Sequence, residues 1–98
     1  MAKKLPPMHP GEVLREEFLI PLGLSAGALA KACNLPRTRV ERIAAETIGV
    51  SADTALRLGK YFRVSPEIWL DLQSDYDLRV ARLTDWPKIE PRIRARAA

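Results

Sequence analysis

Three side chains that could read DNA bases lie within six residues of one another. Arg37 and Thr38 stand at the start of a predicted helix, and Arg42 follows one turn later. A guanidinium can donate two hydrogen bonds to O6 and N7 of guanine, and threonine offers a hydroxyl and a methyl group that can contact thymine. Val40 and Ile43 fall on the opposite side at helical spacing. The segment therefore predicts a helix with an apolar inner face and a cationic outer face.

Two further cations near this helix are candidates for phosphate contacts. Arg39 lies further round the same predicted helix than Arg37 and Thr38, and Lys31 lies before this helix in the chain, as a more distant candidate. Contacts to phosphate fix a protein on DNA without reading sequence. The alternative interpretation is a solvated helix face in which Glu41 and Glu46 form local ion pairs with these arginines.

The charge of the chain is concentrated in the same stretch. The 98 residues carry a net charge of +4, with 16 basic and 12 acidic side chains. Residues 31–63 hold seven basic and three acidic side chains, whereas the segments before and after are each balanced. The whole excess therefore falls in the middle third, and a basic segment of this kind is typical of nucleic-acid binding.

Five helices are expected to position these side chains. Their start and stop signals are caps, prolines and glycines. The first helix begins near Pro10 and closes at Pro21 and Gly23, and the second follows Ser25. The remaining starts are Pro36 for the third helix, Ser51 and Asp53 for the fourth, and Ser65 with Pro66 for the fifth.

The second and third helices have the spacing of a helix-turn-helix. Ala30 is small enough for two helices to cross closely, and Asn34 suits a sharp turn because asparagine tolerates positive φ. Val40 and Ile43 then attach the third helix to the core. In such a motif the second helix lies in the major groove with its N-terminal residues at base edges.

An apolar stripe follows the fifth and longest helix. Trp69, Leu72, Tyr76 and Val80 succeed one another at steps of three and four residues. The stripe could cover the core of the helix-turn-helix, or part of it could form a two-fold contact between copies. A dimer would place two recognition helices about 34 Å apart, as a palindromic site requires.

The length allows one domain, for which we predict an all-α fold. We expect a flexible N-terminus at 1–8, a helix-turn-helix domain with a C-terminal dimerisation helix at 9–83, and an irregular basic tail at 84–98. No stretch has the roughly 18 apolar residues of a membrane span, and the start lacks a secretory signal, so a cytoplasmic protein without membrane association is expected.

The residue inventory argues against catalysis and bound cofactors. His9 and Cys33 are the only residues of their kinds, so neither a metal-ligand cluster nor a Cys/His nucleophilic pair is expected. We expect His9 to be a helix cap or a surface contact and Cys33 to be a small core residue. No metal, no cofactor and no enzymatic activity are predicted.

The stretch from Met8 to about Leu83 resembles the HigA antitoxins of bacterial toxin–antitoxin modules, a branch of the Xre/Cro-type (lambda repressor-like) helix-turn-helix proteins. The matching segments are HPGEVLREEF from His9, PLGLS from Pro21, SADTALRL from Ser51 and SPEIWLDLQ from Ser65. The resemblance implies a dimer that represses its own operon and neutralises a HigB-type toxin, an mRNA-cleaving ribonuclease of the RelE-like class.

The chain departs from the family pattern at two places. Many relatives have glutamine after the cap of the second helix, where this chain has Ala26. Relatives also often carry a glycine and a basic residue after the third helix, where Glu46, Thr47 and Ile48 stand here. Both changes remove expected backbone contacts to DNA, for which the tail arginines Arg92, Arg94 and Arg96 could compensate.

Two alternatives therefore stay open beside a DNA-binding antitoxin. The chain could be an interaction module that only sequesters a toxin, with weak or lost DNA binding. It could also be a stand-alone phage-type regulator without a toxin gene beside it.

Overall fold

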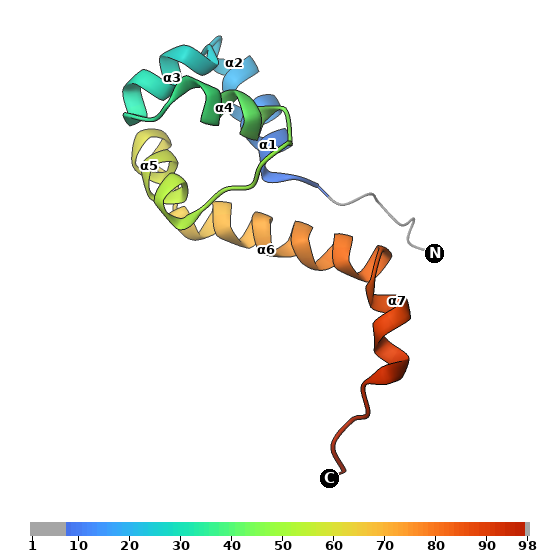
Figure 1. Ribbon diagram of the computed structural model, residues 1–98. Helices are drawn as coiled ribbons and strands as arrows, with labels where there is room; N and C mark the ends of the chain where they lie inside the picture. Colours follow the sequence, from blue (N-terminus) through green and yellow to red (C-terminus); the bar gives the residue numbers. More distant parts are fainter. Residues whose placement is uncertain (1–7, 98) are drawn as a thin grey trace.

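The computed structural model describes residues 8–97, a range in which every regular element is a helix (Figure 1). In chain order the elements are α1 (Pro10–Val13), the π-helical segment η1 (Leu14–Leu19), α2 (Ile20–Leu22), α3 (Ala26–Cys33), α4 (Arg37–Ala44), α5 (Ala52–Phe62), α6 (Pro66–Leu83), α7 (Trp86–Ile89) and the 3-10 segment η2 (Glu90–Arg92). The predicted all-α class is confirmed. The predicted flexible N-terminus at 1–8 lies, apart from Met8, outside the described residues.

The first predicted helix comprises α1, η1 and α2 in direct succession. It continues through Pro21, although we expected this proline to help close it, and it ends at Gly23 with a φ of 59°. A proline ring normally collides with the carbonyl four residues earlier. The π-type turns before Pro21 are wider, with the Ile20 N–H bonded to the Arg15 carbonyl, and this geometry accommodates the ring.

The helix-turn-helix forms as the local signals indicate. The Ser25 hydroxyl caps α3 by accepting a hydrogen bond from the Ala28 N–H at 3.0 Å. Asn34 adopts the left-handed conformation with a φ of 54°, and the next N–H, that of Leu35, bonds back to the Ala30 carbonyl at 2.8 Å. Pro36 is the cap residue of α4 rather than its first helical residue, a shift of one position.

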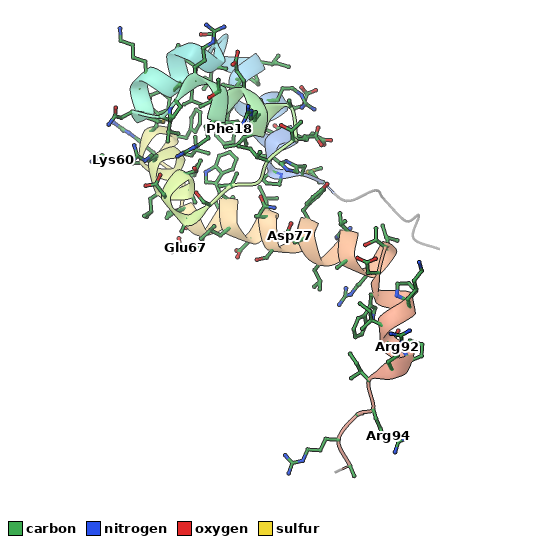
Figure 2. The ribbon with its side chains drawn as sticks, in the orientation of Figure 1. Phe18, Lys60, Glu67, Asp77, Arg92 and Arg94 are labelled. Carbon is green, nitrogen blue, oxygen red and sulfur yellow. The ribbon has the colours of Figure 1, made fainter. Side chains whose placement is uncertain are left out.

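One core joins these helices to α5 and α6. Trp69 of α6 has no exposed surface, and its ring centroid lies 5.3 Å from that of Phe18. The same core contains Leu14 of η1, Leu29 of α3 and Leu58 of α5, each at most 1% exposed. Figure 2 shows Phe18 inside the group of helices from α1 to α5.

Helix α6 extends past this core and carries the C-terminal segment away from it (Figure 1). The principal extents of 52 × 29 × 22 Å express this shape. The tail is more ordered than the irregular segment we expected, because α7 and η2 are helical and regular structure is absent only from 93–97 among the described residues that follow η2. Pro87 and Pro91 stand in the first turn of these two segments, where proline favours a helix start.

Candidate nucleic-acid interface

The outer face of α4 presents the three predicted base-reading side chains. Val40 and Ile43 are each 1% exposed and attach the helix to the core. Arg37, Thr38 and Arg42 are exposed on the other side. Because α4 is short and held along its inner face, these three side chains share one rigid surface that could enter a groove of DNA.

The two predicted phosphate partners lie beside this face in different settings. Arg39 is half-buried, and its Nη1 lies 3.6 Å from Oδ2 of Asp53 at the start of α5. Lys31 is exposed on the last turn of α3. An ion pair with an exposed carboxylate is weak enough for DNA phosphate to displace it.

One carboxylate stands among the α4 arginines. Glu41 Oε2 lies 3.2 Å from Nε of Arg37, one helical turn earlier. Glu46, the second acid considered from the sequence, pairs instead with Arg15 of η1 at 3.2 Å. The local ion pair expected for a solvated face is therefore present at Glu41 and absent at Glu46.

Arg57 of α5 fixes the turn of the helix-turn-helix. Its Nη1 donates hydrogen bonds to the carbonyl oxygens of Cys33 at 3.0 Å and Asn34 at 2.7 Å, at the end of α3. Its Nε donates to Oδ2 of Asp53 at 3.0 Å, the same oxygen that faces Arg39. The free carbonyls at a helix C-terminus carry partial negative charge and favour a cation. This clamp therefore joins α5, the turn and one candidate phosphate partner.

Arg15 performs a similar task at the other end of α4. Its Nη1 donates to the Ala44 carbonyl at 2.5 Å and to Oε2 of Glu46 at 3.2 Å. Glu46 has a φ of 64°, a conformation that glycine adopts more easily. The left-handed conformation at position 46 is thus adopted by a residue whose side chain is held by Arg15.

The connection from α4 to α5 is held by a side chain of α6. Oε1 of Gln73 accepts a hydrogen bond from the Val50 N–H at 2.7 Å, and its Nε2 donates to Oδ1 of Asp77 at 2.9 Å. A Cβ added to Gly49 would stand 2.7 Å from the same Oε1, so the loop lies directly on Gln73. The sequence did not indicate these roles of Arg57, Arg15 or Gln73, because the contacts to Cys33, Ala44 and Val50 join segments more than twenty positions apart.

Two places outside α4 bear on the DNA contacts considered from the sequence. Ala26 begins α3 with a methyl side chain that cannot donate a hydrogen bond. Arg92 and Arg94 lie at the far end of the molecule from α4 (Figure 2). The tail of the same protomer is therefore badly placed to supply a DNA contact that Ala26 cannot make.

The apolar stripe of α6 divides into two parts. Trp69 has 0% exposure within the protomer, so the assignment of this residue to a dimer interface was wrong: it has no surface left to bury. Leu72, Tyr76 and Val80 are each half-buried and keep surface available. Farther along the chain four more large apolar side chains are exposed, namely Leu83, Trp86, Ile89 and Ile93, and Leu78 is exposed on the opposite side of α6.

The one histidine and the one cysteine of the sequence, His9 and Cys33, have structural roles. His9 caps α1, its Nδ1 accepting a hydrogen bond from the Gly11 N–H at 2.8 Å, and its buried ring lies edge-on to Tyr76 of α6. Cys33 belongs to the core as predicted, and burial raises the pKa of its thiol above the ordinary value. Within residues 8–97 no three His, Cys, Asp or Glu side chains come together in a way that could hold a metal ion.

No helix among the described residues is long and apolar enough to cross a membrane.

No protein-family model matches the chain. Over 78 residues it is 51% identical to virulence-associated protein I of Dichelobacter nodosus, a match that covers 80% of this chain and 72% of that protein.

Two solved antitoxin structures superpose on nearly the whole chain. The HigA antitoxin of Pseudomonas aeruginosa, solved with the higBA promoter, has a TM-score of 0.90 and 43% identity over 93% of this chain and 99% of that one. Antitoxin GraA in complex with its operator has a TM-score of 0.91 and 42% identity over 100% and 99% of the two chains. Identity at this level over this coverage establishes descent as well as shape, and the chain belongs to the HigA family of helix-turn-helix antitoxins.

Proposed function

We propose that this chain is the antitoxin of a type II toxin–antitoxin module that binds DNA as a dimer and represses its own operon. The observation that carries the proposal is the outer face of α4, where Arg37, Thr38 and Arg42 project from a helix anchored by buried residues. Relatives at 42–43% identity have been solved with a promoter or operator. No enzymatic activity and no cofactor form part of the proposal.

In this proposal Arg37, Thr38 and Arg42 read base edges, and Arg39 and Lys31 hold phosphates. The assignment follows from direction and reach. The first three project from the outer face of α4, whereas Arg39 is tied sideways to Asp53 and Lys31 lies on the neighbouring helix. Side chains that point straight from a recognition helix meet bases, and those at its flanks meet the sugar–phosphate backbone.

Gel-shift titration with the DNA upstream of the gene tests these roles at moderate, fixed salt. Arg37→Ala should cost about 1–3 kcal/mol and relax the preference at one base position, whereas Arg39→Ala should weaken operator and scrambled DNA alike. Arg79→Ala is the matched control, because Arg79 is an exposed α6 arginine with one ion pair, to Asp75. Equal losses on both DNAs for Arg37→Ala and Arg39→Ala would remove the assigned roles.

The homodimer would be built on Leu72, Tyr76 and Val80 together with the exposed apolar residues that continue to the tail. Leu83, Trp86, Ile89 and Ile93 are exposed in the protomer, and burying apolar surface of this kind is favourable in proportion to its area. A palindromic operator is the expected partner of such a two-fold dimer. Light scattering should give twice the mass of the chain, and Val80→Asp with Leu83→Asp should give the monomer with its helical circular dichroism retained.

The toxin partner would be a HigB-like, RelE-class ribonuclease, and both macromolecules place the function in the cytoplasm. Co-expression with the protein encoded by the neighbouring short reading frame tests this part directly. Survival of cells only when this chain is present supports neutralisation. The absence of any ribonuclease-like neighbour would instead favour a stand-alone regulator.

Ala26 favours a second candidate, a module that sequesters the toxin and has weak or lost DNA binding. A methyl group replaces a side chain that could hydrogen-bond to phosphate at the start of α3. The two candidates separate in the same titration. A dimer that rescues cells from the toxin but gives no shift with its upstream DNA would support sequestration alone.

A further inference from the structure

Glu41 occupies the centre of the face that the proposed function directs at DNA. Successive helical residues are rotated by about 100°, so a side chain at position 41 falls between those at 37 and 38 around the helix axis. It is the only acidic residue of α4. Its side chain is 46% exposed and that of Arg37 is 72% exposed.

A carboxylate at this place needs an explanation from binding. An exposed ion pair one helical turn apart contributes little to stability, so the Arg37–Glu41 contact is not needed to hold α4. The core residues of α4 and the clamps from Arg57 and Arg15 already do that. Against DNA of any sequence, a negative charge on this face opposes the phosphates.

The geometry of the pair gives the carboxylate a selective role. Glu41 accepts from Nε of Arg37, which fixes the plane of the guanidinium and leaves its two Nη groups free. Those groups are the fork that a guanine O6 and N7 can accept. In the proposed complex with DNA, the other lone pairs of the carboxylate face the major groove, where the amino groups of cytosine and adenine are the only base-edge donors.

We propose that Glu41 is a specificity-determining residue of this protein, which orients Arg37 toward guanine and selects a neighbouring base that presents an amino group in the major groove. The inference rests on the proposed function. The carboxylate penalises DNA that offers an acceptor or a methyl group at this place, because a desolvated carboxylate would then lack a donor. Glu41 thereby weakens binding to most sequences and spares the operator.

Fluorescence anisotropy with the full-length protein tests the role of Glu41. The probes are the upstream DNA, a set in which each operator base pair is replaced singly, and a scrambled duplex at one salt concentration. Glu41→Ala should bind scrambled DNA about three- to tenfold more tightly. The penalty for replacing one or two adjacent base pairs, about tenfold or more in the unaltered protein, should fall below about threefold.

Glu41→Gln adds a second, independent readout. The amide keeps the size and one acceptor but gains a donor, so the preferred base at the affected position should move toward adenine, which pairs with an amide in both directions. Asp75→Ala is the control for charge alone, because this exposed α6 carboxylate also pairs with an arginine one turn away. It should leave the base preferences unchanged.

The outcomes decide each idea separately. If Glu41→Ala tightens binding to operator and scrambled DNA by the same factor, the carboxylate acts only through its charge and the inference is overturned. Unchanged affinities would overturn it too, since Glu41 would then lie away from the groove. If the unaltered dimer fails to distinguish its upstream DNA from scrambled DNA, the proposed function fails, and the inference with it.

Discussion

Replacing Arg57 by methionine tests how much of the helix-turn-helix geometry depends on one guanidinium. Methionine keeps the apolar stem of the side chain and removes the donors to the Cys33 and Asn34 carbonyls and to Asp53. A hydrogen bond of this kind contributes about 0.5–1.5 kcal/mol net. The side chain is 36% exposed, which favours the lower half of that range for each, and the ion pair adds about 0.3–0.5 kcal/mol.

The expected loss for Arg57→Met is therefore about 2 kcal/mol, measured by urea unfolding followed by circular dichroism. For a domain of this size the melting temperature should fall by about 8–16 °C. Both proteins must be compared at one concentration, because a dimer is stabilised by mass action. Arg79→Met is the matched control, since Arg79 makes one ion pair on the same kind of exposed helix face and should lose about 0.3–0.5 kcal/mol.

The result that would refute this reasoning is an equal loss for the two variants. Equality would mean that the Arg57 contacts to the α3 carbonyls are exchanged for water at no cost. A loss for Arg57→Met that exceeds the control by more than about 1 kcal/mol would establish the clamp. We also expect this variant to lose operator affinity, because Asp53, which faces Arg39, loses the guanidinium that fixes it.

Substitutions at four further positions probe the core and the turns. Gly11→Ala should cost about 3 kcal/mol or more because the new Cβ would overlap the Ile43 carbonyl oxygen, whereas Gly23→Ala, at a φ of 59° in open space, should cost only about 1–2 kcal/mol. Equal losses of unfolding free energy in urea would contradict the packing argument. Trp69→Phe should lose about 1–2 kcal/mol against about 3–5 kcal/mol for Trp69→Ala, because phenylalanine fills most of the site while both variants remove the buried Nε1–H, which has no partner among the described residues. Similar losses in calorimetry would mean that the packing of the ring does not set the cost. The raised pKa of Cys33 predicts that the stability it contributes is complete below the pKa of the unfolded thiol and is lost as pH rises through the folded pKa; unfolding titrations of Cys33→Ala should lack this alkaline decline, and an identical decline would assign it to other groups.

The sequence predicted most elements whose cause is local. Ser25, Ser51 and Ser65 each cap the helix that follows through a side-chain oxygen, and Asn34 takes the left-handed turn. These interactions join residues within three positions of one another, so a pattern in the chain is sufficient to reveal them. The outer arginines of α4 were found for the same reason, since periodicity alone separates them from Val40 and Ile43.

The features that were missed depend on distant contacts. Nothing near Arg57 indicates that it lies against the Cys33 and Asn34 carbonyls, because the two segments meet only after the chain folds. The spacing that placed Trp69 in the dimer stripe was correct as a helix face. It could not show that the first turn of α6 packs on Phe18 while later turns extend past the core.

The basic residues of 31–63 fall into two groups in the structure, one at the candidate DNA interface and one around a pocket. The salt dependence of DNA affinity can show whether the second group also contacts DNA. Lys31, Arg37, Arg39 and Arg42 belong to the candidate interface, whereas Arg57, Lys60 and Arg63 line a pocket of 580 Å³ between α3 and α5. If only the first group meets DNA, log K against log salt should have a slope of no more than about −7 for a dimer, against about −13 if all seven cations bound phosphate. Anisotropy titrations between about 50 and 200 mM salt measure this slope, because the expected loss of DNA affinity over that range is large. A value beyond about −10 would show that the pocket cations also face DNA, and the clamp formed by Arg57 would then be part of the binding surface rather than its support.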